Sequence, residues 1–114
     1  MKRDPLVYLE DMIDAMEKAE TALVEVDYDR FTNDFMINFV AVRALEIVGE
    51  AVKRLPMSFR DKYPAIPWKR MAGMRDRIIH GYDSIDLDIV WEVIKRDIPQ
   101  LKPQLQKILA EEEG

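Results

Sequence analysis

The sequence predicts an all-α fold, an antiparallel bundle of four to five helices, and three observations support this prediction. Apolar residues recur at three- and four-residue steps along most of the chain, no useful stretch alternates with a period of two, and only four of the 114 residues are glycine. The breaks between the periodic segments are short, which is typical of neighbouring antiparallel helices. A chain of this length is expected to form one domain, residues 1–114, around a single core.

The first helix is predicted over residues 5–26. Asp4 can cap its N-terminus and Pro5 can occupy its first turn, where a missing N–H costs nothing. The apolar residues that follow lie on one helical face: Leu6, Leu9, Ile13, Met16 and Leu23.

The second helix is predicted over residues 29–55 and is apolar around much of its circumference. One stripe contains Phe31, Phe35, Phe39, Val42, Leu45, Val48 and Val52, and further apolar residues widen it. Such a helix must be covered on more than one side. In a chain this small a second subunit can supply the cover, so the sequence predicts a homodimer.

A connector is predicted over residues 56–66, punctuated by prolines and holding one short turn started by Ser58. The third helix is predicted over residues 67–80 because Pro67 suits a first turn and Gly81 suits the terminating residue. This places His80 at or beside the C-terminus of that helix.

A further helix is predicted from about Asp86, with Leu87, Val90, Trp91, Ile94 and Ile98 on one face. Pro99 and Pro103 are expected to kink or restart it, and a last helix runs into the acidic tail. Trp68 and Trp91 lie on apolar stripes, which favours core anchors over platforms for base stacking.

Charge and composition limit the possible functions. The net charge of −5 opposes a simple nucleic-acid binder, although residues 69–77 concentrate Lys69, Arg70, Arg75 and Arg77 against the single acid Asp76. The chain has no cysteine and no credible metal-ligand cluster, so no metal or other cofactor is expected. It has no apolar signal core at Met1–Pro5 and no run near the roughly 20 apolar residues of a membrane span, so a soluble cytoplasmic protein is expected.

The candidate chemistry lies between Met71 and Tyr82, which includes His80, the one histidine of the chain. On a continuous helix Asp76 and His80 are i and i+4, so the carboxylate could orient the imidazole. Arg75 lies about 140° around the helix from His80. The two can reach one phosphate only if the helix end unwinds at Gly81 or if they come from facing subunits.

An imidazole and a guanidinium together suit RNA cleavage. The imidazole can take a proton from a ribose 2′-hydroxyl or give one to the leaving oxygen, and the guanidinium can stabilise the charged phosphorane. The spacing alone also fits a simpler interpretation, in which His80 is a favourable charge beside the helix C-terminus and Arg75 and Arg77 are solvated surface residues.

The motif in its setting resembles the HepT-like proteins of the HEPN family. Arg75 is followed after four residues by His80 and after one more by Tyr82, which resembles their Arg-x4-His-x-Tyr signature. The segments around it are similar too: residues 66–68, 73–75, 83–91 and 97–101, and residues 43–51, where Arg43, Glu46 and Glu50 share a polar face. The resemblance covers essentially the whole chain.

This resemblance implies an antiparallel dimer with a shared cleft, metal-independent endoribonuclease activity, and a toxin role in a type VII-like HEPN/MNT toxin–antitoxin pair. It implies Arg75 and His80 as the catalytic pair, Asp76 as a residue that orients His80 or positions RNA, and a partner MntA-like minimal nucleotidyltransferase. Tyr82 matches the tyrosine that such a partner can modify with AMP, which would block RNA.

Two other functions stay open. The chain could be a catalytically silent module that only binds the nucleotidyltransferase, which its net acidity favours. It could also be a scaffold that presents a mononucleotide to the partner, with the phosphates bound by Arg43, Arg75 and Arg77.

Overall fold

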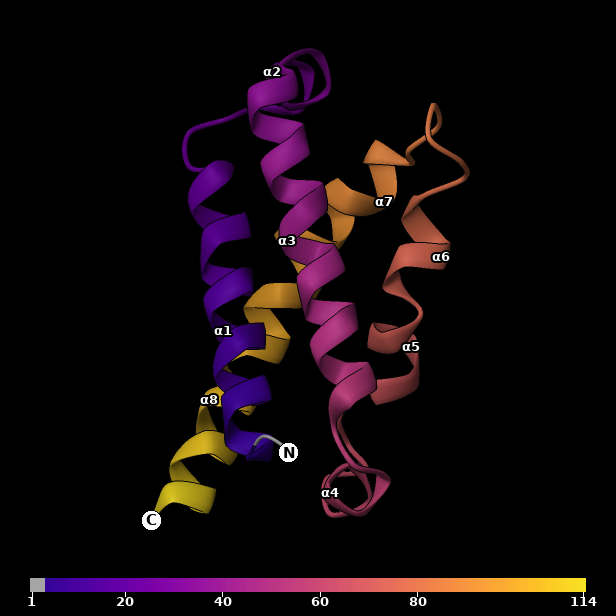
Figure 1. Ribbon diagram of the computed structural model, residues 1–114. Helices are drawn as coiled ribbons and strands as arrows, with labels where there is room; N and C mark the ends of the chain where they lie inside the picture. The colour runs from indigo at the N-terminus through magenta and orange to yellow at the C-terminus, as the bar shows by residue number, and fades with distance from the viewer. Residues whose placement is uncertain (1–3) are drawn as a thin grey trace.

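The computed structural model describes residues 4–114, so the first three residues of the predicted domain lie outside the described residues. Its helices run alternately up and down, which confirms the predicted all-helical antiparallel bundle (Figure 1). Helix α1 (Pro5–Ala22) and helix α3 (Phe35–Arg54) lie side by side, and helix α8 (Ile98–Glu113) packs against α1.

Helix α1 begins as predicted but ends four residues early. The Asp4 side chain accepts a hydrogen bond of 2.9 Å from the Leu6 N–H, which caps the helix. The predicted end at residue 26 is wrong, because the chain turns at Glu25, which has a φ of +56°. The Asp27 carboxylate then accepts from the Arg30 N–H at 2.8 Å and starts helix α2 (Tyr28–Asn33).

The predicted helix over residues 29–55 is interrupted at Asp34. This residue is extended, with φ −112° and ψ 101°, and its carboxylate accepts from the Met36 N–H at 3.0 Å to cap α3. The buried Asn38 amide donates to the Phe31 carbonyl at 3.1 Å and so ties α3 to α2 across the break. The apolar stripe continues through the break, which is why periodicity alone predicts one helix.

The connector contains helix α4 (Met57–Asp61). It starts after Pro56 and not at Ser58 as predicted, because Pro56 is already extended and takes the N-cap position. The Trp68 indole N–H donates to the Arg60 and Tyr63 carbonyls at 3.1 and 3.0 Å. Trp68 is 6% exposed and anchors the connector to the core, as predicted.

The predicted helix over residues 67–80 is two short helices, α5 (Trp68–Ala72) and α6 (Met74–Ile78), separated by Gly73. Gly73 has φ −84° and ψ 10°, so the helical backbone is interrupted there. The end predicted at His80 is also wrong, because Ile79 is extended, with φ −114° and ψ 120°. Both short helices pack against α3 (Figure 1).

The last part of the chain begins with helix α7 (Leu87–Glu92), close to the predicted start. The Asp86 carboxylate accepts from the Ile89 N–H at 3.1 Å and caps it. A π-helical turn, η1 (Val93–Asp97), joins α7 to α8 just before Pro99. Pro103 lies inside α8 without ending it.

The core lies between α1, α3 and the segments behind them. Its largest fully buried side chains include Leu9, Met12, Met16, Phe31, Leu45, Met71, Ile78 and Leu105. Trp91 is only partly buried and packs at the edge of this core, where its ring lies 5.3 Å from the Phe31 ring, centroid to centroid. Within residues 4–114, no helix is long and apolar enough to cross a membrane.

Candidate active site

The helix that carries Arg75 is held close to α3 by Gly49. A Cβ atom at position 49 would lie 3.1 Å from the Met71 carbonyl oxygen and 3.4 Å from the Met74 Cβ, so a glycine allows the close approach of the two elements. Met74 and Ile78 are buried from this side of α6, whereas Arg75 and Asp76 are exposed. The packing of α6 therefore presents Arg75 and Asp76 to solvent.

His80 lies on a tight loop that follows α6. Ile79 and Ile85 form an antiparallel bridge, the His80 N–H donates to the Ser84 carbonyl at 2.8 Å, and the Asp86 N–H donates to the Ile78 carbonyl at 2.7 Å. Gly81 has a φ of +114°, a left-handed backbone value that glycine adopts without strain. The loop has a fixed base and an exposed tip, and His80 stands where the tip begins.

The side chains of the loop tip are turned to solvent. His80 is exposed, and Tyr82 is 99% exposed, so the tyrosine is not the packed loop aromatic that is its simplest interpretation. A group attached to the Tyr82 hydroxyl would meet no steric barrier from the chain itself.

The predicted pairing of Asp76 with His80 does not occur within one chain. Because α6 ends at Ile78, the i and i+4 relation of a continuous helix no longer applies. Among residues 4–114, no hydrogen bond or ion pair joins the two side chains.

Arg75 is not among the residues that line the hollow at His80. This shallow hollow is lined by His80, Ser84, Ile85, Asp86, Leu87 and Asp88. The sequence allowed Arg75 and His80 to meet if the helix unwound at its end, and the helix does end before His80, two residues earlier than predicted. Within the single chain this hollow is nevertheless formed without Arg75.

The predicted RNA-binding residues Lys69, Arg70 and Arg77 and the catalytic candidate Arg75 do not all line one hollow. Arg75 and Arg77 are two residues apart on α6 and so point about 200° apart around the helix. Arg77 and Arg70 line a groove toward η1 and α8, whereas Lys69 lines a different hollow beside Trp68, which Arg70 also borders. Arg70 also lies 3.7 Å from the Asp97 carboxylate.

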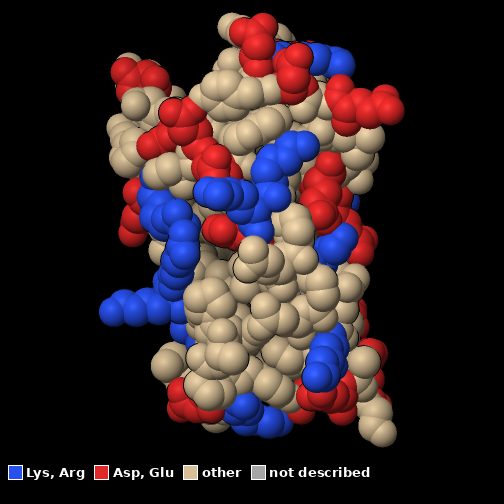
Figure 2. Space-filling model, turned by 180° about the vertical axis from the view of Figure 1, so that it is seen from behind, with Lys and Arg blue, Asp and Glu red and all other residues tan. Residues whose placement is uncertain are grey.

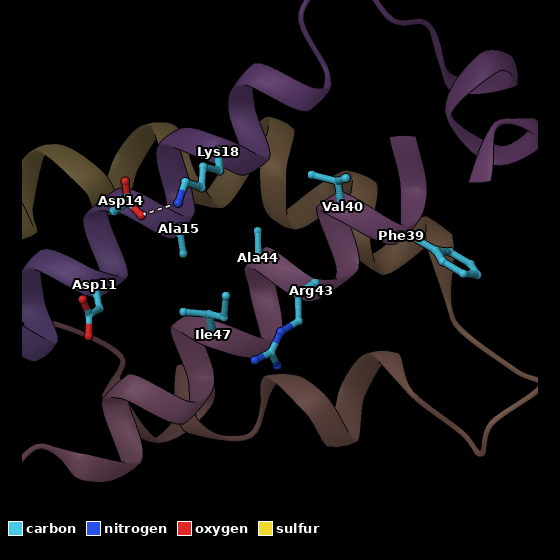
Figure 3. A pocket seen from close by; sticks show the side chains of 9 residues that line it. All are labelled: Asp11, Asp14, Ala15, Lys18, Phe39, Val40, Arg43, Ala44 and Ile47. Carbon is cyan, nitrogen blue, oxygen red and sulfur yellow. Dashed lines mark ion pairs between the residues drawn. The ribbon is translucent and has the colours of Figure 1, made fainter. Parts of the chain in front are cut away.

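The predicted polar face of α3 is present. The Arg43 guanidinium lies 3.4 Å from the Glu50 carboxylate and 3.8 Å from that of Glu46. Figure 3 shows that Arg43 lies at the edge of a hollow between α1 and α3, with Ala15 and Ala44 facing each other across its middle. On α1 the ion pair of Lys18 with Asp14, at 2.8 Å, lies at the same hollow.

Sequence analysis missed the acidic and amide side chains near the predicted arginines. Asp97 from η1 and Gln100 and Gln104 from α8 line the groove with Arg70 and Arg77, although they follow the arginines by twenty residues or more. No local pattern in the sequence predicts these neighbours, because they depend on where η1 and the first turns of α8 lie relative to α5 and α6.

The chain matches known proteins over nearly its full length. The family model described as "Ribonuclease HepT-like" matches residues 12–108. A Methanocaldococcus jannaschii protein named "Putative RNase" is 42% identical over 113 residues, which cover 99% of this chain and 93% of the relative. No solved structure gives a significant match.

Two further relatives come from other organisms. A Thermococcus cleftensis protein named "Probable ribonuclease HepT" is 43% identical over 95% of this chain and 98% of its own length. A "Putative RNase" of Caldanaerobacter subterraneus is 40% identical over 96% of this chain and 98% of its own length. With the family model matched across α1 to α8, the chain belongs to the HepT-like ribonuclease family.

Proposed function

We propose that this protein is a metal-independent endoribonuclease that cuts RNA with Arg75 and His80. The observation that carries the proposal is the position of His80, exposed on a hydrogen-bonded loop directly after the helix of Arg75, in a chain of the HepT-like ribonuclease family. The hydrogen-bonded loop base fixes the backbone of His80, and the exposed tip lets an RNA strand reach its side chain.

The proposed reaction needs only side chains of this protein and water. The His80 imidazole takes the proton of a ribose 2′-hydroxyl, the 2′-oxygen forms a bond to phosphorus, and the bond from phosphorus to the 5′-oxygen breaks. The leaving oxygen takes a proton from water, so the products are a 2′,3′-cyclic phosphate and a 5′-hydroxyl. The Arg75 guanidinium donates hydrogen bonds to the phosphoryl oxygens as their charge grows.

The proposal includes a homodimer in which Arg75 of one subunit serves the His80 of the other. Within one chain Arg75 is absent from the lining of the hollow at His80, so a facing subunit is the simplest source of the guanidinium. Asp76 is also exposed and belongs to the same subunit as Arg75. It would position RNA or orient His80 of the partner subunit.

The N-terminal half of α3 is the proposed dimer surface. Phe35, Met36 and Phe39 are each more than 60% exposed, and the rings of Phe35 and Phe39 contact each other at 5.8 Å between centroids. Val40 on the same helix is exposed as well. Together these four apolar side chains form a patch of the kind that marks an interface. This half of α3 and the loop after α6 lie at the same end of the bundle, so pairing there brings both loops near the interface (Figure 1).

Tyr82 is the proposed point of regulation. A cognate MntA-like nucleotidyltransferase, the antitoxin of a toxin–antitoxin pair in the cytoplasm, would transfer AMP from ATP to its hydroxyl, with release of diphosphate and of the hydroxyl proton. The 99% exposure of this side chain makes the hydroxyl accessible, and it stands two residues from His80. An added nucleotide would place negative charge and bulk where RNA phosphates approach.

Induction of this chain alone in a bacterial host, beside its His80→Ala variant, tests the proposal. Growth and the integrity of total RNA are followed together. We expect growth arrest with RNA fragmentation from the natural chain and neither from the variant, which should fold because His80 is exposed. Normal growth and intact RNA with a folded natural chain would instead favour a silent interaction module, in keeping with the net charge of −5.

A further inference from the structure

A groove between α5–α6 and η1–α8 contains a buried donor without a partner. We call it the α6–α8 groove. Within the described residues, the Nη1 atom of Arg77 is buried and has no hydrogen-bond acceptor. Buried polar groups are nearly always hydrogen-bonded, and an unsatisfied cationic one is costly. Arg77 lines the groove, and its guanidinium keeps a donor that no acceptor of the described residues satisfies.

The walls of the α6–α8 groove mix donors with acceptors. Arg70 and Arg77 line it with hydrogen-bond donors from α5 and α6, and Asp97 lines it with a carboxylate acceptor from η1. Gln100 and Gln104 add amides that can do both, and the Gln104 amide nitrogen is already engaged with the Gln100 carbonyl at 3.0 Å. Figure 2, seen from behind, shows basic side chains gathered on this side of the molecule with acidic ones around them.

The π-helical turn η1 brings the acceptor to this place. Pro99 cannot donate to the Lys95 carbonyl, so the helix is irregular here, and the wider turn ends at Asp97. The Asp97 carboxylate comes within 3.7 Å of the Arg70 guanidinium, a distance too long for a strong hydrogen bond. Both groups remain available to a ligand.

The size and floor of the groove narrow the ligand class. Its volume is about 230 Å³, below the roughly 300–1,000 Å³ of pockets that enclose drug-sized ligands, so it suits one flat ring system. Met71, Met74 and Leu101 give it an apolar floor. A simple anion would be repelled by Asp97, whereas the edge of a nucleobase offers both donors and acceptors and its face suits an apolar surface.

We propose that the α6–α8 groove is a subsite for one unpaired base of the RNA strand that His80 cuts. The Arg77 guanidinium and the Asp97 carboxylate bind the edge of the base, and Arg70 binds a neighbouring phosphate. The inference rests on RNA as the substrate proposed above. Arg75 and Arg77 lie on opposite sides of α6, so a strand that crosses this short helix meets both.

RNA binding in the His80→Ala background tests the subsite, because the RNA then stays intact. The probes are short single-stranded homopolymers of A, C, G and U, followed by fluorescence anisotropy. Arg77→Gln should weaken binding of the preferred homopolymer by about tenfold, since a charge-assisted hydrogen bond is lost. Arg54→Gln removes the same charge from an exposed site outside the groove and should leave the affinity close to that of the parent.

Asp97→Asn distinguishes recognition of the base edge by Asp97 from a general effect of its negative charge on RNA binding. It replaces an acceptor by an amide, so we expect the order of preference among the four homopolymers to change, with about a tenfold shift for the base that loses its partner. Removal of a repulsive charge alone would strengthen all four equally, and that result would contradict the proposal. Gln100→Ala, an exposed rim variant, provides a second loss-of-binding test if Arg77→Gln does not fold.

The outcomes distinguish this inference from the proposed function. Unchanged affinity and order in all groove variants would overturn the subsite and assign the groove to a protein ligand, while RNA cleavage by the natural chain would still stand. Base-specific binding that depends on Arg77 and Asp97, with no cleavage by the natural chain, would support the subsite and overturn the proposed RNase.

Discussion

Tyr82 and His80 are close in sequence but have different structural surroundings. The His80 backbone is fixed by a hydrogen bond to Ser84, whereas the Tyr82 side chain is 99% exposed. The histidine can therefore be held for catalysis while the tyrosine is presented for modification.

Tyr82→Phe should leave the fold and RNA cleavage intact and prevent modification. Loss of a fully exposed hydroxyl changes the free energy of unfolding by no more than about 0.5 kcal/mol. Intact-mass measurement after incubation with the cognate nucleotidyltransferase and ATP checks the prediction. Addition of AMP to the Phe variant would mean that another residue is the acceptor, and Tyr28→Phe, at another exposed tyrosine, is the matched control.

At the scale of an element, the loop after α6 depends on the backbone of Gly81. Its φ of +114° is a backbone angle that residues with a side chain rarely adopt. Gly81→Ala should lower the free energy of unfolding by more than about 1 kcal/mol. Chemical denaturation provides the measurement, and RNA cleavage should fall with the displaced His80.

Gly73→Ala is the matched control for Gly81→Ala. A Cβ at position 73 would make only ordinary contacts, 3.5 Å from the Lys69 carbonyl oxygen, and its φ is negative. The free energy of unfolding should stay the same or rise by up to about 1 kcal/mol. If both alanine variants lowered the free energy of unfolding equally, the left-handed backbone of Gly81 would not be what the loop depends on.

The sequence predicted the elements where a local signal was strong. Asp4 caps the first helix as predicted, and the helix predicted from about Asp86 begins at Leu87, because in both places the apolar pattern starts directly after the aspartate. The interruptions at Asp34 and Gly73 were not predicted, because a break of one residue leaves the apolar stripe on nearly the same side. These breaks come from local capping and packing, which compete with periodicity.

At the scale of the whole molecule, Glu112 ties the end of α8 to the connector after α4. Its carboxylate accepts from the Lys62 ammonium at 2.9 Å and from the Tyr63 hydroxyl at 2.8 Å. The hydrogen bond from Lys62, and then that from Tyr63, hold the pKa of Glu112 below its ordinary value. This contribution to stability is present above the ordinary glutamate pKa of about 4.3 and is lost as the pH falls through the lowered folded value.

Glu112→Gln should therefore lower the melting temperature at neutral pH and have a smaller effect below about pH 4. Thermal unfolding of both proteins across this range measures the difference. A gap that stays constant from neutral to acidic pH would contradict the assigned role of the ionised carboxylate.

The proposed dimer surface on α3 can be tested by a single charge. Phe39→Glu places an acid in the exposed apolar patch and should yield monomers in sedimentation equilibrium, with loss of RNA cleavage. Val24→Glu makes a similar change at another exposed apolar residue, 64% accessible, outside that patch and should remain dimeric. A dimeric Phe39→Glu protein would rule out this surface.

Mixed dimers test whether the site is shared between subunits. A dimer that pairs an Arg75→Ala chain with a His80→Ala chain, isolated with two different tags, keeps one intact site if Arg75 and His80 come from different subunits. It should recover about half of the natural activity. No recovery would mean that both residues act within one chain.

The catalytic assignment of Arg75 and His80 came from the resemblance to HepT-like proteins, since their spacing alone also fits a surface arginine and a helix-end histidine. The structure exposes both side chains, and their catalytic roles stay a prediction. Four basic residues within 69–77 suggested one phosphate patch, yet positions two apart on a helix face opposite sides, so Arg77 belongs to a different groove. The partners of Arg77 in that groove come from η1 and α8, which only the tertiary fold brings close.

Cleavage of labelled RNA by the purified protein in the presence of a metal chelator tests the central claim most directly. We expect fragments that end in a 2′,3′-cyclic phosphate, and a loss of rate of about 10² or more in both His80→Ala and Arg75→Ala. Full cleavage by the His80→Ala protein, or no cleavage by the natural chain under conditions where it is folded, would contradict it.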